Sequence, residues 1–476
     1  MGGYFGVASK GDCSLDLFYG TDYHSHLGTY AGGLAVLKDG KFLRDIHGIA
    51  NSPFRTEFER DILRMRGSNQ GIGVISDTDP QPLLMGSKHG DYAIVTVGRV
   101  NNLKDIVNEA HSANVHFLEG NEGDRNPTEA IGYLIDTGKD LEDGIKIAQE
   151  RVEGSCSMLV MTKKGIYAAR DKLGRTPIVL GKKEDAYAAT FETGAFPNLD
   201  FEAERDLGPG EIVLITPEGV EQKQKPREAM QICSFLWVYY GYPSSDYEKI
   251  NVEEVRNNCG RFLARRDREK GLQIDLIAGI PDSGTGHAIG YANEAKIDYG
   301  RPYVKYTPTW FRSFMPQDID MKKLVAKMKL QPVKAKISGK RLLFCEDSIV
   351  RGVQLEDVIE RLYNMGATEV HMRPACPPLI YGCKFINFSR SKSVLELASR
   401  NAIKALEGSE HPEIKTLEEY ANPDSEKNGV MVDRIRSRLR LTTLEYQKLP
   451  DLVSAIGLPK EKLCTFCWDG CEGCVK

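Results

Sequence analysis

The strongest constraint on the fold is an alternation of strand and helix signals in the second half of the chain. Residues 274–280 form a largely apolar run broken only by Asp275, and residues 341–345 and 369–373 form two more. The first run enters a Pro-Asp-Ser-Gly turn followed by a helical pattern from His287, and the second precedes an amphipathic stretch. Strands that alternate with helices in this way predict a parallel sheet, with ligands bound at the carboxyl ends of the strands.

A loop with two acids follows the second of these strands. It reads Glu-Asp-Ser-Ile-Val-Arg-Gly from Glu346 to Gly352 and leads into the amphipathic stretch. Paired carboxylates suit ribose hydroxyls or Mg2+, and the backbone N–H groups at the start of a helix suit a phosphate. Gly352 would let the backbone approach such a ligand closely. For an Asp-Ser turn alone, an ordinary strand-to-helix turn capped by Asp347 and Ser348 is the alternative.

The first 228 residues have a different pattern, in which short apolar segments alternate with glycines. Four of these segments predict antiparallel strands: 3–7, 32–36, 92–97 and 157–161. Helical periodicity is confined to a few segments, such as 128–136 and 140–152. This half is therefore expected to contain stacked sheets with covering helices. The polar stretch 222–230, rich in Lys, Gln and Pro, is the expected linker.

Composition narrows the class of protein. A length of 476 residues with 41% hydrophobic content suits two or three cored domains, and we expect two. The net charge of -4 gives no field that favours nucleic acid. The chain shows neither a secretory signal nor an apolar run long enough to cross a bilayer, so a cytoplasmic location with no membrane partner is expected. The eleven cysteines are then not expected to form disulfides.

The full string from Glu346 to Gly352 reproduces the 5-phosphoribosyl-1-pyrophosphate (PRPP) signature of type I phosphoribosyltransferases. Over nearly its whole length, the chain resembles the glutamine phosphoribosylpyrophosphate amidotransferase family. The Ile-Pro-Asp-Ser-Gly run at 280–284 looks like the pyrophosphate loop of that family, and the Met-Lys-Leu run at 328–330 is a further match. Glu346 departs from the usual Asp, which keeps the charge and adds one methylene.

The resemblance implies an α/β fold in three parts. Residues 1–228 are expected to form a glutaminase-like αββα sandwich of the N-terminal-nucleophile (Ntn) hydrolase type. Residues 229–450 are expected to form a phosphoribosyltransferase domain, with a parallel sheet and helices on both faces. Residues 451–476 are expected to form a Cys-rich metal-binding tail packed on the second domain.

The resemblance also implies which residues bind PRPP. They come from the two loops and from the segment between them: Asp282, Ser283, Gly284, Lys305, Arg312, Lys329, Glu346, Asp347, Ser348, Ile349, Val350, Arg351 and Gly352. Mg2+ is expected on Ser283, Glu346 and Asp347. The segment 305–333 resembles a lid whose cations would stabilise the departing pyrophosphate. A basic surface loop is the alternative.

The glutaminase chemistry of the family is expected to be absent. Gly2 stands at the position of the family's nucleophilic cysteine and has no side chain that could attack an amide. Three further site positions also depart from the family pattern: Ser76 replaces an Arg, Val97 replaces an Asn and Pro127 replaces an Asp. We therefore assign no catalytic residue to this half and expect no hydrolysis of glutamine.

Four cysteines match the metal ligands of one branch of the family. Cys464 and Cys467 lie in the tail, and Cys233 and Cys383 match the two distant partners. Together they imply a [4Fe-4S] cluster with a structural role. Four thiolates equally suit structural zinc, and the pair Cys471 and Cys474 could complete a local zinc site.

The function implied by the resemblance is a PRPP-dependent transferase of purine biosynthesis. It would form 5-phosphoribosylamine and pyrophosphate from PRPP, using ammonia that is free or supplied by a partner instead of ammonia from its own hydrolysis of glutamine. The alternatives are a non-catalytic PRPP or nucleotide sensor and a scaffold subunit. The resemblance further implies a homo-oligomer, expected to be a tetramer, and regulation by purine nucleotides.

Overall fold

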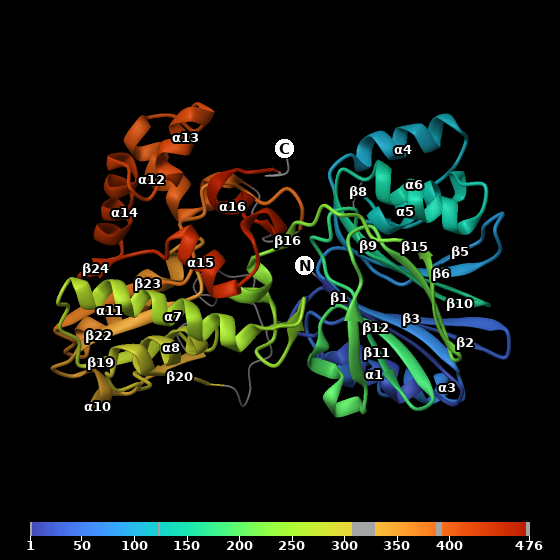
Figure 1. Ribbon diagram of the computed structural model, residues 1–476, viewed down its shortest axis with the longest axis horizontal. Coiled ribbons are helices and arrows are strands. Elements are labelled where there is room, and N and C mark those ends of the chain that lie inside the picture. The colour runs from blue at the N-terminus through green and yellow to red at the C-terminus, as the bar shows by residue number, and fades with distance from the viewer. Residues whose placement is uncertain (1, 122–123, 307–328, 387–392, 473–476) are drawn as a thin grey trace.

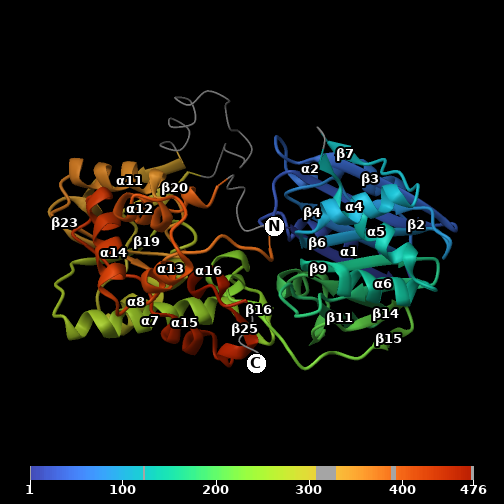
Figure 2. The same cartoon turned by 90° about the horizontal axis from the view of Figure 1, so that it is seen from above.

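The protein is seen in a computed structural model that describes residues 2–121, 124–306, 329–386 and 393–472. Its two halves lie side by side, and the start of the chain lies between them (Figures 1 and 2). Within the described ranges, no helix is both long and apolar enough to span a membrane.

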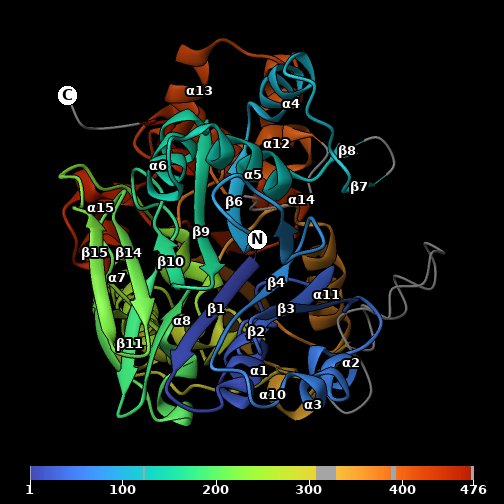
Figure 3. The same cartoon turned by 90° about the vertical axis from the view of Figure 1, so that its right-hand side faces the viewer.

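The first half contains two stacked antiparallel sheets (Figure 3). Counted over the described residues, one sheet has seven strands in the order β13-β11-β12-β1-β4-β2-β3: Glu202–Asp206, Val179–Lys183, Ala186–Thr190, Gly2–Ser9, Gln70–Ser76, Ala31–Lys38 and Lys41–Gly48. The other has six in the order β15-β14-β10-β9-β6-β5: Gly219–Gln224, Ile212–Thr216, Gly165–Ala169, Gly154–Thr162, Tyr92–Val100 and Leu83–Met85. β1 is buried along its whole length because it is central to its sheet and covered on both faces.

Helices cover the outer face of each sheet. One layer comprises α1 (Ser14–Asp22), α2 (Phe54–Phe58) and α3 (Asp61–Met65), and the other comprises α4 (Leu103–Ser112), α5 (Pro127–Thr137) and α6 (Leu141–Arg151). Separate apolar clusters fill the two helix–sheet interfaces, and a third fills the space between the sheets. The half is therefore a four-layer αββα sandwich, as predicted. The remaining short elements are β7 (Gly120–Asn121), β8 (Asp124–Arg125), η1 (Thr193–Ala195) and η2 (Pro197–Leu199).

The second half is built on a parallel sheet. Its described strands follow the order β19-β22-β23-β24: Leu276–Gly279, Arg341–Glu346, Glu369–Pro374 and Thr443–Leu444. On one face lie α7 (Val252–Glu269) and α8 (Thr285–Ala295). The opposite face is covered by α10 (Lys334–Ile337), α11 (Val353–Asn364), α12 (Ala398–Glu407), α13 (Ile414–Ala421) and α14 (Glu426–Arg438). The predicted parallel sheet with helices on both faces is confirmed.

The tail pairs with the segment that joins the halves. β25 (Leu463–Cys464) runs parallel to β16 (Ile232–Cys233), while α15 (Leu449–Ile456), η5 (Lys460–Lys462) and α16 (Phe466–Asp469) surround this pairing (Figure 1). The polar linker predicted at 222–230 begins later than expected, because Gln222 and Gln224 still pair with β14 in the sheet.

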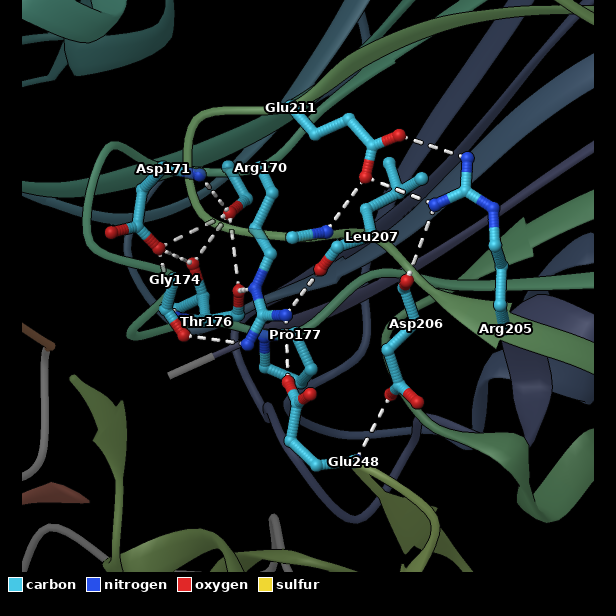
Figure 4. Close-up of polar contacts among 12 residues, drawn as sticks. Arg170, Asp171, Gly174, Thr176, Pro177, Arg205, Asp206, Leu207, Glu211 and Glu248 are labelled. Atoms are coloured by element: carbon cyan, nitrogen blue, oxygen red, sulfur yellow. Dashed lines mark hydrogen bonds and ion pairs between the residues drawn. The ribbon is translucent and has the colours of Figure 1, made fainter. Parts of the chain in front are cut away.

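A hairpin of the second half is anchored in the first half. It follows η3 (Leu236–Tyr240) and consists of β17 (Asp246–Tyr247) and β18 (Ile250–Asn251). At its tip, Glu248 accepts an ion pair of 2.7 Å from the fully buried guanidinium of Arg170, which also donates to the carbonyls of Gly174 and Thr176 (Figure 4). The backbone N–H of Glu248 donates to Asp206 Oδ1 at 3.0 Å. A buried charge is thus satisfied only when the halves are together.

Candidate active site

The loops that follow β19 and β22 meet because these two strands are parallel neighbours. Ser283 Oγ donates to Glu346 Oε1 at 2.7 Å, and the backbone N–H of Ile280 donates to the Cys345 carbonyl at 3.1 Å. A Cβ at Gly284 would lie 2.2 Å from the same carbonyl, so only glycine fits there. The predicted pyrophosphate loop and the predicted acidic loop are therefore one structural unit.

The two acids at the end of β22 are buried side by side. Glu346 is 9% exposed and Asp347 is 5% exposed. Burial, reinforced by the negative charge of Asp347, raises the pKa of Glu346 well above its usual range, and the hydrogen bond from Ser283 partly offsets this. Two adjacent carboxylates with few internal partners suit a divalent cation or ribose hydroxyls. The donor set expected for Mg2+ (Ser283, Glu346 and Asp347) is brought together.

The rest of the acidic loop contributes mainly backbone. Ile349 is 5% exposed and packs in the core of the second half, and Val350 packs against the cluster that joins the halves. Ser348 Oγ donates to Asp347 Oδ1, so it faces the acids. Gly352 has φ +76° and precedes α11 with no side-chain cap, which leaves the first N–H groups of the helix for a ligand.

Arg351 is directed away from the acids. Its guanidinium forms an ion pair of 2.6 Å with Glu396 in η4 (Val394–Glu396). The structure therefore places the side chain of this predicted PRPP ligand on the side of the loop that faces α12 and α14.

The basic segment between the loops begins and ends in a short ladder. β20 (Tyr303–Lys305) pairs antiparallel with β21 (Leu330–Pro332), and the Tyr306 N–H donates to the Lys329 carbonyl at 2.9 Å. The ladder thus brings Lys305 and Lys329 to one place. Lys305 Nζ lies 2.5 Å from Asp282 Oδ2, which connects the ladder to the predicted pyrophosphate loop. Arg312 and Lys327 lie outside the described residues.

Sequence reasoning missed one cation near the acids. Arg256 in α7 is buried and donates to the carbonyls of Trp237, Tyr239 and Gly241 at 2.8–3.1 Å. Burial lowers the pKa of Arg256, and the charge of Asp347 opposes this change. The available signal was an arginine on the apolar stripe of an amphipathic helix, where a charge requires a partner.

In the first half, the position expected for a nucleophile has no room for a side chain. Gly2 pairs with Ser76 across β1 and β4, and a Cβ on Gly2 would lie 2.5 Å from the Ile75 carbonyl oxygen. Gly98 has φ +150°, and a Cβ there would lie 1.8 Å from the Ser155 carbonyl oxygen. At these two positions, the backbone occupies the space that side chains would need.

The other departures from the family pattern serve local structure. Ser76 Oγ accepts hydrogen bonds from the N–H groups of Thr78 and Asp79. Pro127 is the first residue of α5, and the preceding Asn126 caps that helix by accepting from the Thr128 N–H at 2.9 Å. These residues stabilise a turn and a helix start.

The four predicted metal-ligand cysteines converge at the junction of the halves. β16 and β25 place Cys233 opposite Cys464. The Cys467 thiol donates to the sulfur of Cys383 and lowers the pKa of Cys383 to about 6. Burial raises the pKa of Cys233, and the nearby thiols of Cys464 and Cys383 raise it further.

Convergence alone does not make a formed metal site. Over the residues that the structure describes, no three His, Cys, Asp or Glu side chains already stand as metal ligands. The four thiols are free, and their chemistry suits iron or zinc. Cys471 is in a disulfide, which corrects the expectation of fully reduced cysteines, and Cys474 lies outside the described residues.

Comparisons with known proteins agree with this architecture. Residues 69–196 match the family model described as a glutamine amidotransferase domain. An amidophosphoribosyltransferase of Mycobacterium tuberculosis is 29% identical over 484 residues, which cover 98% of this chain and 85% of that protein. An amidophosphoribosyltransferase of Bacillus subtilis is 28% identical over 416 residues, which cover 85% of each.

A solved structure extends the likeness to three dimensions. Glutamine PRPP amidotransferase of B. subtilis, complexed with ADP and GMP, superposes with a TM-score of 0.83 at 25% identity. The superposition covers 98% of this chain and 96% of that one, so both halves and their arrangement are shared. With the sequence matches over the same length, this result shows that the chain belongs to the amidophosphoribosyltransferase family.

Proposed function

We propose that this protein transfers the ribose-phosphate group of PRPP to ammonia, forming 5-phosphoribosylamine and pyrophosphate in purine biosynthesis, and that it does not hydrolyse glutamine itself. The observation that carries the proposal is the contact between Ser283 and Glu346, which joins the two loops expected to hold pyrophosphate and ribose. Relatives named amidophosphoribosyltransferase over nearly the full chain support the same reaction.

In the proposed step, the bond between ribose C1 and the pyrophosphate oxygen breaks and a bond between C1 and nitrogen forms. Ammonia already carries a free electron pair, and the proton that it loses goes to solvent. The N–H groups at the start of α11 would bind the 5-phosphate. Lys305 and Lys329 lie together at the pyrophosphate side and would balance the growing charge on the leaving group.

Glu346, Asp347 and Ser283 would hold Mg2+. Oxygen donors from buried carboxylates are the ligands that this cation prefers, and the raised pKa of Glu346 reflects negative charge without a cation beside it. When bound, Mg2+ supplies positive charge to the pyrophosphate oxygens. Without it, the two acids can bind ribose hydroxyls directly.

Cys233, Cys383, Cys464 and Cys467 would hold a [4Fe-4S] cluster with a structural role. Their place at the junction supports this role, because Arg99 of the first half donates to the Cys383 carbonyl at 2.8 Å. Zinc suits the same four thiolates. Iron, acid-labile sulfide and zinc, measured on anaerobically purified protein, would distinguish the two metals.

The proposed nitrogen source is ammonia that is free in solution or supplied by a partner. The lack of space for a side chain at Gly2 supports an external source, since an amide cannot be attacked there. A homo-oligomer and regulation by purine nucleotides are part of the proposal, the latter because the B. subtilis relative binds ADP and GMP.

The test is pyrophosphate release from PRPP and Mg2+ with ammonium, with glutamine or with no amine. Turnover is expected with ammonium alone, together with no release of glutamate from glutamine. Glutamate release that a thiol alkylator abolishes would overturn the claim about glutamine. Clear PRPP binding with no turnover on any amine would favour the sensor function instead.

A further inference from the structure

A pocket lies beside the acidic loop, between the start of α11 and the helices α12 and α14 (Figure 1). Its volume is about 490 Å3, which is in the range of small-molecule sites. Two pairs of apolar residues form its floor, each pair spaced by one helical turn: Ala398 with Ala402 and Ile435 with Leu439. The two alanines offer a flat surface, which suits a planar ring.

The rim of the pocket is cationic. Arg351, Arg434 and Arg438 line it, together with the polar side chains of Asn401 and Ser437. Arg438 is only weakly engaged, at 3.4 Å from Asn401 Oδ1 and 4.0 Å from Glu356. No carboxylate of the described residues forms an ion pair with Arg434. Two arginines one turn apart on α14 are therefore available to an anion.

We propose that this pocket binds a nucleoside monophosphate or a molecule of the same chemistry, in which one phosphate is joined to a planar, weakly polar body. The phosphate would lie against Arg434 and Arg438, and the ring would lie on Ala398 and Ala402. An apolar floor under an arginine rim matches a ligand with one anionic end and one flat end.

The pocket is distinct from the site proposed for PRPP. Its lining includes none of Ser283, Glu346, Asp347 and Lys305, and it shares only Arg351 and Gly352 with the acidic loop. The ion pair of Arg351 with Glu396 turns that side chain away from the acids and toward this pocket.

Occupancy of the pocket would act on the acidic loop. The first N–H of α12, from Ala398, donates to the Val350 carbonyl at 2.7 Å, and Gly352 is both a wall of the pocket and the residue before α11. A ligand that draws α12 and α14 together therefore changes the support of the loop. This regulatory part rests on the proposed function, whereas the binding part does not.

The experiment is calorimetric titration of the full-length protein with AMP, adenosine or inorganic phosphate, with PRPP and Mg2+ saturating and no amine present. AMP is expected to bind at least about tenfold more tightly than either fragment, because both ends of the pocket contribute. Equal affinities for AMP and phosphate would overturn the proposal.

Three variants locate the site. Arg434→Gln combined with Arg438→Gln should weaken AMP binding by about tenfold or more, since each removes a charge-assisted hydrogen bond. Ala402→Leu should fill the floor and weaken it without a change of charge. Arg436→Gln is the matched control, because Arg436 is on the same helix, pairs with Asp433 and lies outside the pocket.

PRPP affinity, measured separately in each variant, distinguishes the two proposals. It is expected to stay within twofold of the parent protein. Unchanged AMP binding in both the double variant and Ala402→Leu would overturn the new site. A parallel loss of PRPP and AMP binding would also overturn it, because the pocket would then belong to the phosphoribosyl site. Loss of PRPP turnover with AMP binding intact would count against the proposed function alone.

Discussion

The two halves keep their folds but differ at the places where chemistry is expected. In the second half, Glu346 and Asp347 are held together in a buried site that still carries two acids. In the first half, the Ile75 carbonyl closes the space beside Gly2, and Ser76 caps a turn. Sheet packing and site chemistry therefore depend on different residues, and a scaffold can outlast its site.

The largest expected effect comes from removing an acid of the second half. Asp347→Asn should lower pyrophosphate release with ammonium by at least about 100-fold, because a charge that stabilises the reacting groups is lost. The matched control is Asp357→Asn on the exposed face of α11, which should leave the rate unchanged. An equal effect of both substitutions would remove the contrast between the halves.

The contact that joins the halves should give the next largest effect. Arg170→Met leaves Glu248 without its partner and several carbonyls without a donor, so it should destabilise the protein by about 3–5 kcal/mol. Urea denaturation of each variant measures this change. Arg151→Met breaks the exposed pair with Glu109 and should cost less than about 1 kcal/mol. Equal midpoints for the two variants would show that the halves do not depend on this contact.

Restoring a cysteine should not restore the first half. Gly2→Cys places a Cβ against the Ile75 carbonyl and should destabilise the protein by about 1–3 kcal/mol, with no glutamate released from glutamine. Gly48→Cys in β3 is the control, since its nearest atom, the Tyr30 carbonyl oxygen, would be 3.9 Å away. Glutamate release by Gly2→Cys would show that one residue separates this half from an active glutaminase.

The smallest effect concerns pH at the junction. Burial, with the negative charge of Glu248, raises the pKa of Asp206 to about 6. A raised carboxyl pKa stabilises the folded state below pH 4, and this stability is lost as pH rises to about 6. Asp206→Asn should therefore raise stability by about 1–2 kcal/mol at pH 7.5 and change nothing at pH 4. The measurement is the Tm at both pH values, with the exposed Glu204→Gln as control. A gain at pH 4 as large as the gain at pH 7.5 would contradict this assignment.

Much of the fold and part of the site could be predicted from the sequence. The αββα sandwich and the parallel sheet follow from local periodicity, and the paired loops follow from strand order, because neighbouring parallel strands end at one edge. Each of these signals lies within a short stretch of the chain.

The features that sequence reasoning missed depend on contacts between distant segments. Arg351 matches a binding motif, yet its partner is Glu396, which only the tertiary fold brings close. Arg256 is read as one more helix arginine until its carbonyl partners are seen. Arg170 and Glu248 belong to different halves, so no periodicity links them.

The pairing of β16 with β25 sets an order for the assembly of the molecule. Ser234, beside β16, donates to the Cys464 carbonyl across 230 residues of sequence. During synthesis on the ribosome, the connecting segment therefore emerges long before the strand that completes its hydrogen bonds. The first half can fold while the chain is still being made, whereas the junction closes only when the last segment is released.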